Sequence, residues 1–371
     1  MNDIKRCIFH VPNNIDESGK SGSSRRPLEM IKAFKENGYV VDVVMGYAKE
    51  RKEQISKIKK NIKNGIKYDF LYSESSTMPT LLTEKNHLPM HPFLDFGFIK
   101  FCKKNDIKIG LFYRDIYWKY DFYRKNIPLW QSMLSIPLYK YDLYKYRKLL
   151  DILYLPSLEM KEMLPIKNRL KNKYKIEDLP PGCEKNKLIE EKKDNSVLNI
   201  FYVGGISKDV YNFEKLLEAV KGKEKLKLKI CCRENEWNNQ KNRLSKYIAN
   251  NINIVHLSGN ELSECYREAD ICSLIFEESD YRKFAMPIKL FEYLSNNKPI
   301  IATKNTAAGN FVEKNSIGWT VDYDTEEIAN LLEKLSNNKN EIQAIKENEI
   351  NIIEKNLWRE RAQKVANDLK N

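Results

Sequence analysis

The sequence predicts an α/β protein with two doubly wound parallel sheets, one in each half of the chain. Two observations favour this fold class. Short β-branched or aromatic runs alternate with longer amphipathic stretches, which is the pattern of repeated strand–helix–strand units and hence of parallel sheets. The alternation also comes as two series, separated by a segment rich in proline and charge at 178–196.

Each series contains strands and helices in regular alternation. In the first, we expect strands at 7–11, 40–45, 70–73, 108–113 and 152–155, and helices at 24–37, 49–64, 93–105 and 129–149. In the second, we expect strands at 199–203, 227–232, 253–257, 271–276 and 299–303, and helices at 212–221, 238–250, 261–268 and 288–295. From residue 325 onward the pattern is helical only.

A chain of 371 residues suits two domains better than one core. We predict an N-terminal domain at 1–178, a linker at 179–196 and a C-terminal domain at 197–355. Two such sheets would place the carboxyl ends of both sets of strands around a shared crevice, where open α/β sheets bind ligands. Functional residues are therefore expected in loops that follow strands.

Composition excludes several classes of protein. Apolar residues make up 42% and charged residues 31%, which excludes collagenous and wholly disordered chains. No stretch reaches the length of a membrane-spanning helix, so we expect a cytoplasmic chain. The seven cysteines form no C-x-x-C pair, and Pro89 separates His87 from His91, so no metal site is predicted.

The net positive charge of the chain comes almost entirely from its first 150 residues. Residues 1–150 hold 28 Lys and Arg against 16 Asp and Glu, whereas the remainder holds 36 against 35. This asymmetry points to an anionic partner of the first half, which could be nucleic acid, a membrane surface or a phosphorylated substrate. A Lys-rich composition of the source would explain part of the excess but not its position.

Two segments of the first half are candidates for acceptor binding. After the first strand, Gly22 would let the backbone approach a ligand, Ser23 or Ser24 would cap the next helix, and Arg25 or Arg26 would lie in its first turn. A basic residue there opposes the helix dipole, which is consistent with a bound anion or with a solvent-exposed basic turn.

The fourth strand ends in Arg114 and Asp115, near Tyr113, Tyr117 and Trp118. A carboxylate among aromatic rings has its pKa raised by desolvation and could act as a general base toward an acceptor hydroxyl. The rings would suit a sugar. Alternatively, Asp115 pairs with Arg114 or caps a turn.

Residues 113–146 carry eight of the 21 tyrosines, interleaved with lysines and arginines. Such a surface could stack nucleic-acid bases, but no nucleic-acid motif accompanies it. We favour contact with an anionic membrane. An ordinary amphipathic helix would explain about half of these residues.

The most specific pattern lies at 275–303. A strand is followed by a polar loop and by a helix that begins near Pro287 and carries Lys289 and Glu292 three residues apart on one face. The helix N-terminus and the ammonium group could bind a diphosphate, and the carboxylate could accept two ribose hydroxyls. A core helix with an ion pair is the alternative.

The pattern P-x-K-x-x-E-Y-L-x-x-x-K-P-I-I-A-T resembles the donor-nucleotide segment of GT-B glycosyltransferases, especially those of the family 4 type. Around Ile288, Lys289 and Glu292 it is also similar to the membrane-associated glucuronosyltransferase of xanthan synthesis. The likeness extends to 201–209 and 179–184. It implies two Rossmann-like domains, with a terminal helix at 356–371 returning to the first one.

The resemblance also implies roles for individual residues. Lys289 would contact the donor diphosphate and Glu292 the ribose, with Arg233 as a second phosphate contact and Ile288 beside them. Gly204 and Gly205 would keep the backbone open beneath the phosphates. Phe284 stands where family 4 enzymes carry a glutamate against the donor sugar, which leaves room for an inverting mechanism with Asp115 as the base.

These observations predict a metal-independent glycosyltransferase that moves a sugar from a UDP- or GDP-linked donor to a lipid-linked oligosaccharide of surface polysaccharide assembly. The enzyme would lie on the cytoplasmic face of an anionic membrane and would bind no nucleic acid. Two alternatives stay open: a nucleotide-sugar epimerase of the same architecture and a nucleic-acid-binding protein.

Overall fold

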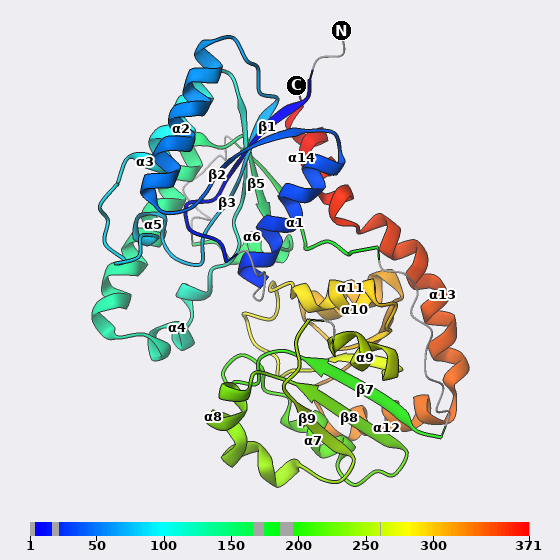
Figure 1. Ribbon diagram of the computed structural model, residues 1–371. Helices are drawn as coiled ribbons and strands as arrows, with labels where there is room; N and C mark the ends of the chain where they lie inside the picture. The colour runs from blue at the N-terminus through cyan, green and yellow to red at the C-terminus, as the bar shows by residue number, and fades with distance from the viewer. Residues whose placement is uncertain (1–3, 17–21, 166–173, 186–195, 260, 371) are drawn as a thin grey trace. The chain divides into compact units, whose positions relative to one another are not determined.

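The computed structural model describes residues 4–16, 22–165, 174–185, 196–259 and 261–370, and it divides the chain into two compact units (Figure 1). Unit 1 comprises Met1–Gly182 and Trp358–Asn371, and unit 2 comprises Cys183–Leu357. The chain therefore passes from unit 1 to unit 2 between Gly182 and Cys183, within the predicted linker. Most of that linker, 186–195, is outside the described residues.

Unit 1 contains a six-stranded parallel sheet in the order β2-β1-β3-β4-β5-β6. Its strands are β1 (Arg6–His10), β2 (Val40–Val44), β3 (Phe70–Glu74), β4 (Lys108–Phe112), β5 (Ile152–Leu155) and β6 (Lys175–Asp178). Its helices are α1 (Gly22–Glu36), α2 (Ala48–Lys63), α3 (Leu94–Lys104), α4 (Asp121–Asn126), α5 (Leu129–Leu149), α6 (Glu159–Met163) and α14 (Trp358–Leu369), with short 3-10 turns η1 (Thr80–Leu82) and η2 (Tyr117–Lys119). Figure 1 shows α1 and α14 on one face of the sheet, and α2, α3 and α5 on the other.

Unit 2 contains a second six-stranded parallel sheet in the order β12-β11-β10-β7-β8-β9. Its strands are β7 (Leu198–Val203), β8 (Leu226–Cys231), β9 (Ile252–Val255), β10 (Ile271–Leu274), β11 (Ile300–Thr303) and β12 (Gly318–Val321). Its helices are α7 (Glu214–Val220), α8 (Glu234–Leu244), α9 (Glu261–Glu268), α10 (Ile288–Ser295), α11 (Ala307–Asn315), α12 (Thr325–Asn337) and α13 (Lys339–Lys355), with the 3-10 turn η3 (Ser245–Tyr247). Two parallel sheets confirm the predicted fold class.

The central strands form because their apolar runs are buried on both faces, as parallel sheets require. Every residue of β3, β5, β10 and β11 is buried. All seven cysteines are free and buried. In the described part of the chain, no helix has both the length and the apolar character needed to cross a membrane.

The last helix, α14, completes unit 1. Its residues Trp358, Ala362, Val365 and Leu369 are buried against that unit. A Cβ at Gly182 would lie 2.7 Å from the Trp358 Cα, and a Cβ at Gly110 would lie 2.9 Å from a Leu369 methyl carbon. The helix therefore packs on the sheet at positions where only glycine leaves enough room.

Several elements differ from the sequence-based expectation. The edge strands β6 and β12 and the helices α4, α6 and α11 are absent from it. In addition, α8 runs from Glu234 to Leu244, whereas a helix at 238–250 was predicted. The error arose because polar residues dominate the start of α8, and Leu244 is its only buried residue.

Candidate active site

Helix α10 positions the predicted donor-site residues at the carboxyl edge of the second sheet. Pro287 precedes it in extended conformation, and Leu290, Phe291, Tyr293 and Leu294 are buried. Burial of these side chains fixes the rotation of the helix, so Lys289 and Glu292 share a half-buried face. The bounds Ile288–Ser295 are those predicted from the sequence.

The Lys289 side chain lies over Gly204. A Cβ placed on Gly204 would be 2.5 Å from Cε of Lys289 and 2.6 Å from the Tyr202 hydroxyl oxygen. Since no side chain fits there, the glycine lets the lysine reach the turn after β7. Sequence reasoning had placed Lys289 and Gly204 in one site, and the structure brings them together.

Two tyrosines hold this turn in place. The Tyr202 hydroxyl donates a hydrogen bond to the Gly205 carbonyl at 2.5 Å, and the Tyr293 hydroxyl accepts one from the Val203 N–H at 3.1 Å. Burial raises the pKa of both phenols well above the usual value, so both stay protonated. The turn and the start of α10 are therefore locked to each other.

Lys289 has no protein partner in the described part of the chain: neither a hydrogen bond nor an ion pair involves its ammonium group. It lies beside the end of β8, where its positive charge partly opposes the rise in the pKa of Cys231 that burial causes. A half-buried cation at a helix N-terminus, above a glycine turn, is suited to bind an anion such as a phosphate.

The other predicted donor residues lie on the same sheet edge. Gly205 is covered by Tyr211, whose ring carbon would be 2.7 Å from an added Cβ. Arg233 immediately precedes α8, with its side chain 67% exposed and 3.8 Å from Glu236. Ile288 is the half-buried first residue of α10. Arg233 is thus a surface arginine, and its contact with a phosphate stays a prediction.

In unit 1, Asp115 follows β4 and is half-buried. Its Oδ1 accepts a hydrogen bond from the Tyr117 N–H at 2.8 Å, so this carboxylate caps the turn into η2. Arg114 donates to Glu74 at 3.1 Å, and burial lowers its pKa. Turn capping was one of the two interpretations of Asp115, and its role as a base stays a prediction.

The aromatic residues next to Asp115 differ in exposure. Trp118 is 2% exposed and stacks on Tyr139, with centroids 5.2 Å apart and planes at 5°. Tyr117 is half-buried, and its hydroxyl lies 3.0 Å from that of Tyr139. Trp118 is therefore a core residue here, which departs from its predicted place at the acceptor, because its ring fills the space between η2 and α5.

The residues of the first loop lie at the start of α1. Gly22 and Ser23 are its first two residues, so the helix begins before the position at which a serine cap was expected. Arg25 is half-buried in the same turn. Arg26 is buried, with Nε 3.3 Å from Glu74 and Cζ 3.5 Å from the Phe112 ring centroid. One of the two candidate arginines thus belongs to the core.

The donor-side geometry agrees with a family comparison. Residues 184–351 match the family described as glycosyl transferases group 1, and this range contains the glycine turn, Lys289 and Glu292. The match lies within unit 2 and covers less than half of the chain. Among curated proteins, none matches the sequence.

Comparison with solved structures shows that the chain has the GT-B fold. HepE of Anabaena, crystallised with UDP and glucose, has a TM-score of 0.62 and 12% sequence identity, covering 98% of this chain and 99% of that one. WaaG, a glycosyltransferase involved in lipopolysaccharide biosynthesis, gives 0.59 and 12% with the same coverage. A UDP-forming trehalose-phosphate synthase from Burkholderia xenovorans gives 0.60 and 11%, again over 98% and 99%.

One buried residue of unit 2 was not identified from the sequence. Arg282, in the loop between β10 and α10, is 7% exposed. An arginine in a polar loop is normally solvated, so its sequence context gave no signal. No group of three potential metal ligands lies together among the described residues. The expected independence from metal stays a prediction.

Proposed function

We propose that the enzyme transfers a sugar from a nucleotide-diphosphate donor held by unit 2 to an acceptor hydroxyl held by unit 1. The observation that carries this proposal is the Lys289 ammonium group, which lies over Gly204 at the N-terminus of α10 without a protein partner. As the donor bond breaks, negative charge grows on the leaving diphosphate, and a fixed cation and helix N-terminus stabilise it. HepE has been crystallised with UDP-glucose, which supports a uridine donor.

Calorimetric titration with UDP and GDP tests the donor site. We expect one of them to bind, and Lys289→Ala to weaken that binding by about 10-fold or more, the effect of a lost charge-assisted contact. Glu292→Ala should weaken nucleotide binding but not binding of pyrophosphate. Lys283→Ala is the matched control, because this lysine is exposed and pairs with Asp280 at 2.8 Å.

The proposal fails if Lys289→Ala leaves the affinity for both nucleotides unchanged. Duplex DNA serves as a third titrant, since tight DNA binding without nucleotide binding would favour the nucleic-acid alternative. Release of free UDP-linked epimer, without transfer, would favour an epimerase.

We further propose that Asp115 accepts the proton of the acceptor hydroxyl. It follows a strand at the carboxyl edge of the first sheet, the usual place for reactive groups in such sheets. Asp115→Asn keeps an oxygen for the Tyr117 N–H, so the turn should persist while kcat falls. Retention of most of the wild-type kcat would assign the base to another group.

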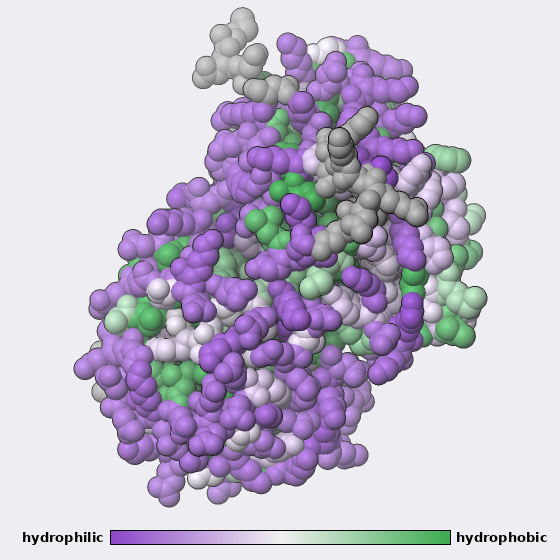
Figure 2. Space-filling view, turned by 180° about the vertical axis from the view of Figure 1, so that it is seen from behind, coloured by the Kyte–Doolittle hydropathy of each residue, from purple (hydrophilic) through white to green (hydrophobic). Residues whose placement is uncertain are grey.

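The acceptor is proposed to be a lipid-linked oligosaccharide at an anionic membrane, on the cytoplasmic face. The exposed side of helix α5 supports this. Its exposed residues are apolar in the first half of the helix and include lysines in the second half. They form a stripe that consists of Leu129, Trp130, Met133, Leu134, Pro137, Lys140, Tyr144 and Lys148. Leu129 is 73%, Trp130 65% and Met133 70% exposed. Figure 2 shows hydrophobic residues, in green, along the edge where Figure 1 places α4 and α5.

Apolar and aromatic side chains beside lysines match the headgroup region of an anionic bilayer. The role of WaaG in lipopolysaccharide biosynthesis agrees with this acceptor class.

Vesicle sedimentation tests the membrane surface. The protein should bind vesicles with anionic lipid at low salt and release them as salt rises. Trp130→Glu with Met133→Glu, and separately Lys140→Ala with Lys148→Ala, should each reduce binding. Lys57→Ala with Lys60→Ala removes the same charge from the exposed face of α2 and should have little effect. Equal binding by all variants would exclude α5 as the contact.

A further inference from the structure

The glycine turn after β7 lies next to two side chains of opposite charge. Near Gly204 is Lys289, whose Cε would be 2.5 Å from a Cβ on that glycine. Near Gly205 is Glu236, from the first turn of α8, whose Oε2 would be 3.5 Å from a Cβ on that glycine. Because consecutive Cα atoms are only about 3.8 Å apart, a diphosphate on this turn would lie close to both groups.

The Glu236 carboxylate is held against the turn. Its Oε2 accepts a hydrogen bond from the Ile206 N–H at 3.2 Å, although the side chain is 31% exposed. Burial raises the pKa of the Tyr202 phenol, and the negative charge of Glu236 adds to this rise. Backbone N–H groups of such turns are donors that phosphates use. The carboxylate therefore occupies a donor that would otherwise be available to a phosphate.

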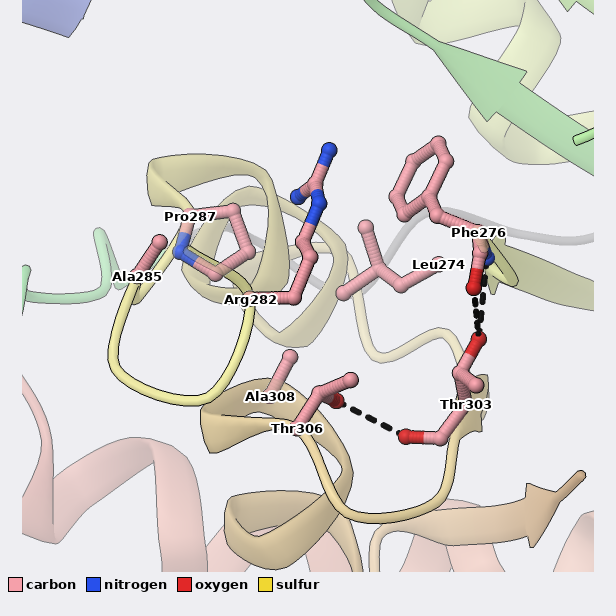
Figure 3. Close-up of a pocket in the computed structure, with 8 residues that line it drawn as sticks. All are labelled: Leu274, Phe276, Arg282, Ala285, Pro287, Thr303, Thr306 and Ala308. Carbon is pink, nitrogen blue, oxygen red and sulfur yellow. Dashed lines mark hydrogen bonds between the residues drawn. The ribbon is translucent and has the colours of Figure 1, made fainter. Parts of the chain in front are cut away.

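Two arginines of the same sheet edge leave Glu236 largely unneutralised. Arg233 Nη1 is 3.8 Å from its Oε1, on a side chain that is 67% exposed, so this ion pair is weak. Arg282 donates to a backbone carbonyl and lies 4.3 Å from the Phe276 ring centroid and 4.9 Å from that of Tyr211. Figure 3 shows its guanidinium group beside Phe276. Among the described residues, no ion pair joins Arg282 to Glu236.

The charge of the nucleotide changes during the proposed transfer. The acceptor oxygen forms a bond to the anomeric carbon of the sugar, its proton passes to the base, and the bond between that carbon and the β-phosphate oxygen breaks. The electron pair stays on the phosphate. At neutral pH the β-phosphate keeps most of this additional charge, because the second pKa of a terminal phosphate is about 6. Lys289 and the N-terminus of α10 attract the charge, so they favour the product over the donor.

We propose that Glu236 opposes this preference and distinguishes the free nucleoside diphosphate from the nucleotide sugar. The proposal rests on the proposed function, because it needs a diphosphate at Lys289. A carboxylate close to the β-phosphate repels the product, with its additional charge, more than it repels the donor. Release of product limits the turnover of many enzymes. Glu236 is then a residue that shortens the time for which the product occupies the site.

Calorimetry with two ligands that differ only in this charge tests the proposal. If the nucleotide screen gives UDP, the ligands are UDP and its β-methyl ester; if it gives GDP, they are GDP and its β-methyl ester. Glu236→Gln removes the negative charge and keeps an oxygen for the Ile206 N–H. We expect this variant to bind the free nucleotide about 10-fold more tightly than the wild type does, and the ester only about threefold more tightly.

Two control variants accompany this measurement. Glu234→Gln removes the same charge from the exposed first residue of α8, two residues earlier and therefore on the opposite side of the helix. It should change neither affinity by more than about twofold. Lys289→Ala should weaken both ligands, the free nucleotide more than the ester. Thermal unfolding without ligand shows whether Glu236→Gln is folded, and stopped-flow displacement should show slower release of the free nucleotide from it.

Four outcomes would overturn the proposal. Glu236→Gln could tighten both ligands by the same factor, which would show that the carboxylate does not distinguish them. Unchanged affinities would place the diphosphate away from Glu236. Weaker binding of both ligands would make Glu236 a residue that binds the nucleotide or supports the turn. If the wild type binds neither UDP nor GDP, the proposed function itself fails, and this inference fails with it.

Discussion

At the scale of single residues, the proposed donor site depends on a contact between a glycine and a lysine. A Cβ added to Gly204 would lie 2.5 Å from Cε of Lys289 and 2.6 Å from the Tyr202 hydroxyl oxygen. Tyr202 cannot move away without losing its bond to the Gly205 carbonyl. Any side chain at position 204 therefore displaces the end of Lys289.

We predict that Gly204→Ala weakens nucleotide binding by about 10-fold while the protein stays folded, because a displaced ammonium group loses its charge-assisted contact. Isothermal calorimetry and thermal unfolding measure the two effects. Gly97→Ala is the control: an added Cβ at Gly97 meets nothing within 4 Å, and alanine favours the helix. Unchanged nucleotide affinity in Gly204→Ala would contradict the placement of Lys289.

The sequence predicted the residues of this contact because they belong to local patterns. A proline before a helix and a lysine and a glutamate three residues apart are visible without a structure, as is a glycine pair after a strand. Arg282 and Trp118 were not predictable in this way. Their burial depends on Tyr211, Phe276 and Tyr139, which come from other elements.

At the scale of elements, α5 presents an exposed stripe on one side and a buried carboxyl group on the other. Asp142 is 4% exposed, and its Oδ2 accepts a hydrogen bond from the Thr80 N–H at 2.7 Å. Burial raises its pKa from 3.8 to about 7, with a smaller contribution from the charge of Asp95. The helix is thus attached to η1 by a group that gains charge near neutral pH.

Asp142 should make stability depend on pH. Because its pKa is higher in the folded than in the unfolded state, the folded protein holds the proton more tightly, and stability falls as pH rises from about 4 to about 7. We predict that the stability advantage of Asp142→Asn over the wild type is larger at pH 8 than at pH 5 by about 2–3 kcal/mol. Urea unfolding at both pH values measures this difference.

Asp121→Asn is the control for this prediction, since Asp121 is an exposed carboxylate of the same unit. Its effect should be small at both pH values. A stability difference between Asp142→Asn and the wild type that does not change with pH would show that Asp142 titrates normally.

Some elements were predicted to the residue, and others were missed. The bounds of α5, α9, α10 and β5 agree with the sequence-based ranges. The edge strand β6 has the sequence KIED and no fully buried residue, so no apolar run marks it. It forms only because β5 offers it a hydrogen-bonding partner. Formation of such a strand depends on pairing with a neighbouring strand, which the local sequence does not reveal.

At the scale of the whole molecule, the two units are not consecutive in the chain. Unit 1 is built from both ends of the sequence, because α14 packs on α1 and the first sheet. Val365 and Ala366 on this helix are fully buried. Substitutions in α14 should therefore lower the stability of unit 1 and leave that of unit 2 unchanged.

We predict that Val365→Asp destabilises unit 1 by about 3 kcal/mol or more, the cost of a buried unpaired charge. Hydrogen exchange should show faster exchange in β3 and β4 and unchanged protection in β7 and β8. Asn367→Asp places the same charge on the exposed side of the helix and should have little effect. Uniform loss of protection in both units would contradict their separate cores.

The chain enters unit 2 at Cys183 and leaves it at Leu357, and these two residues form a parallel bridge. Unit 2 is thus a continuous insertion whose ends meet. During synthesis a ribosome completes this insertion before it makes α14, so the sheet encoded first lacks its covering helix until all of unit 2 has been made. Unit 2 should then become native first on the ribosome, although most of unit 1 is encoded before it.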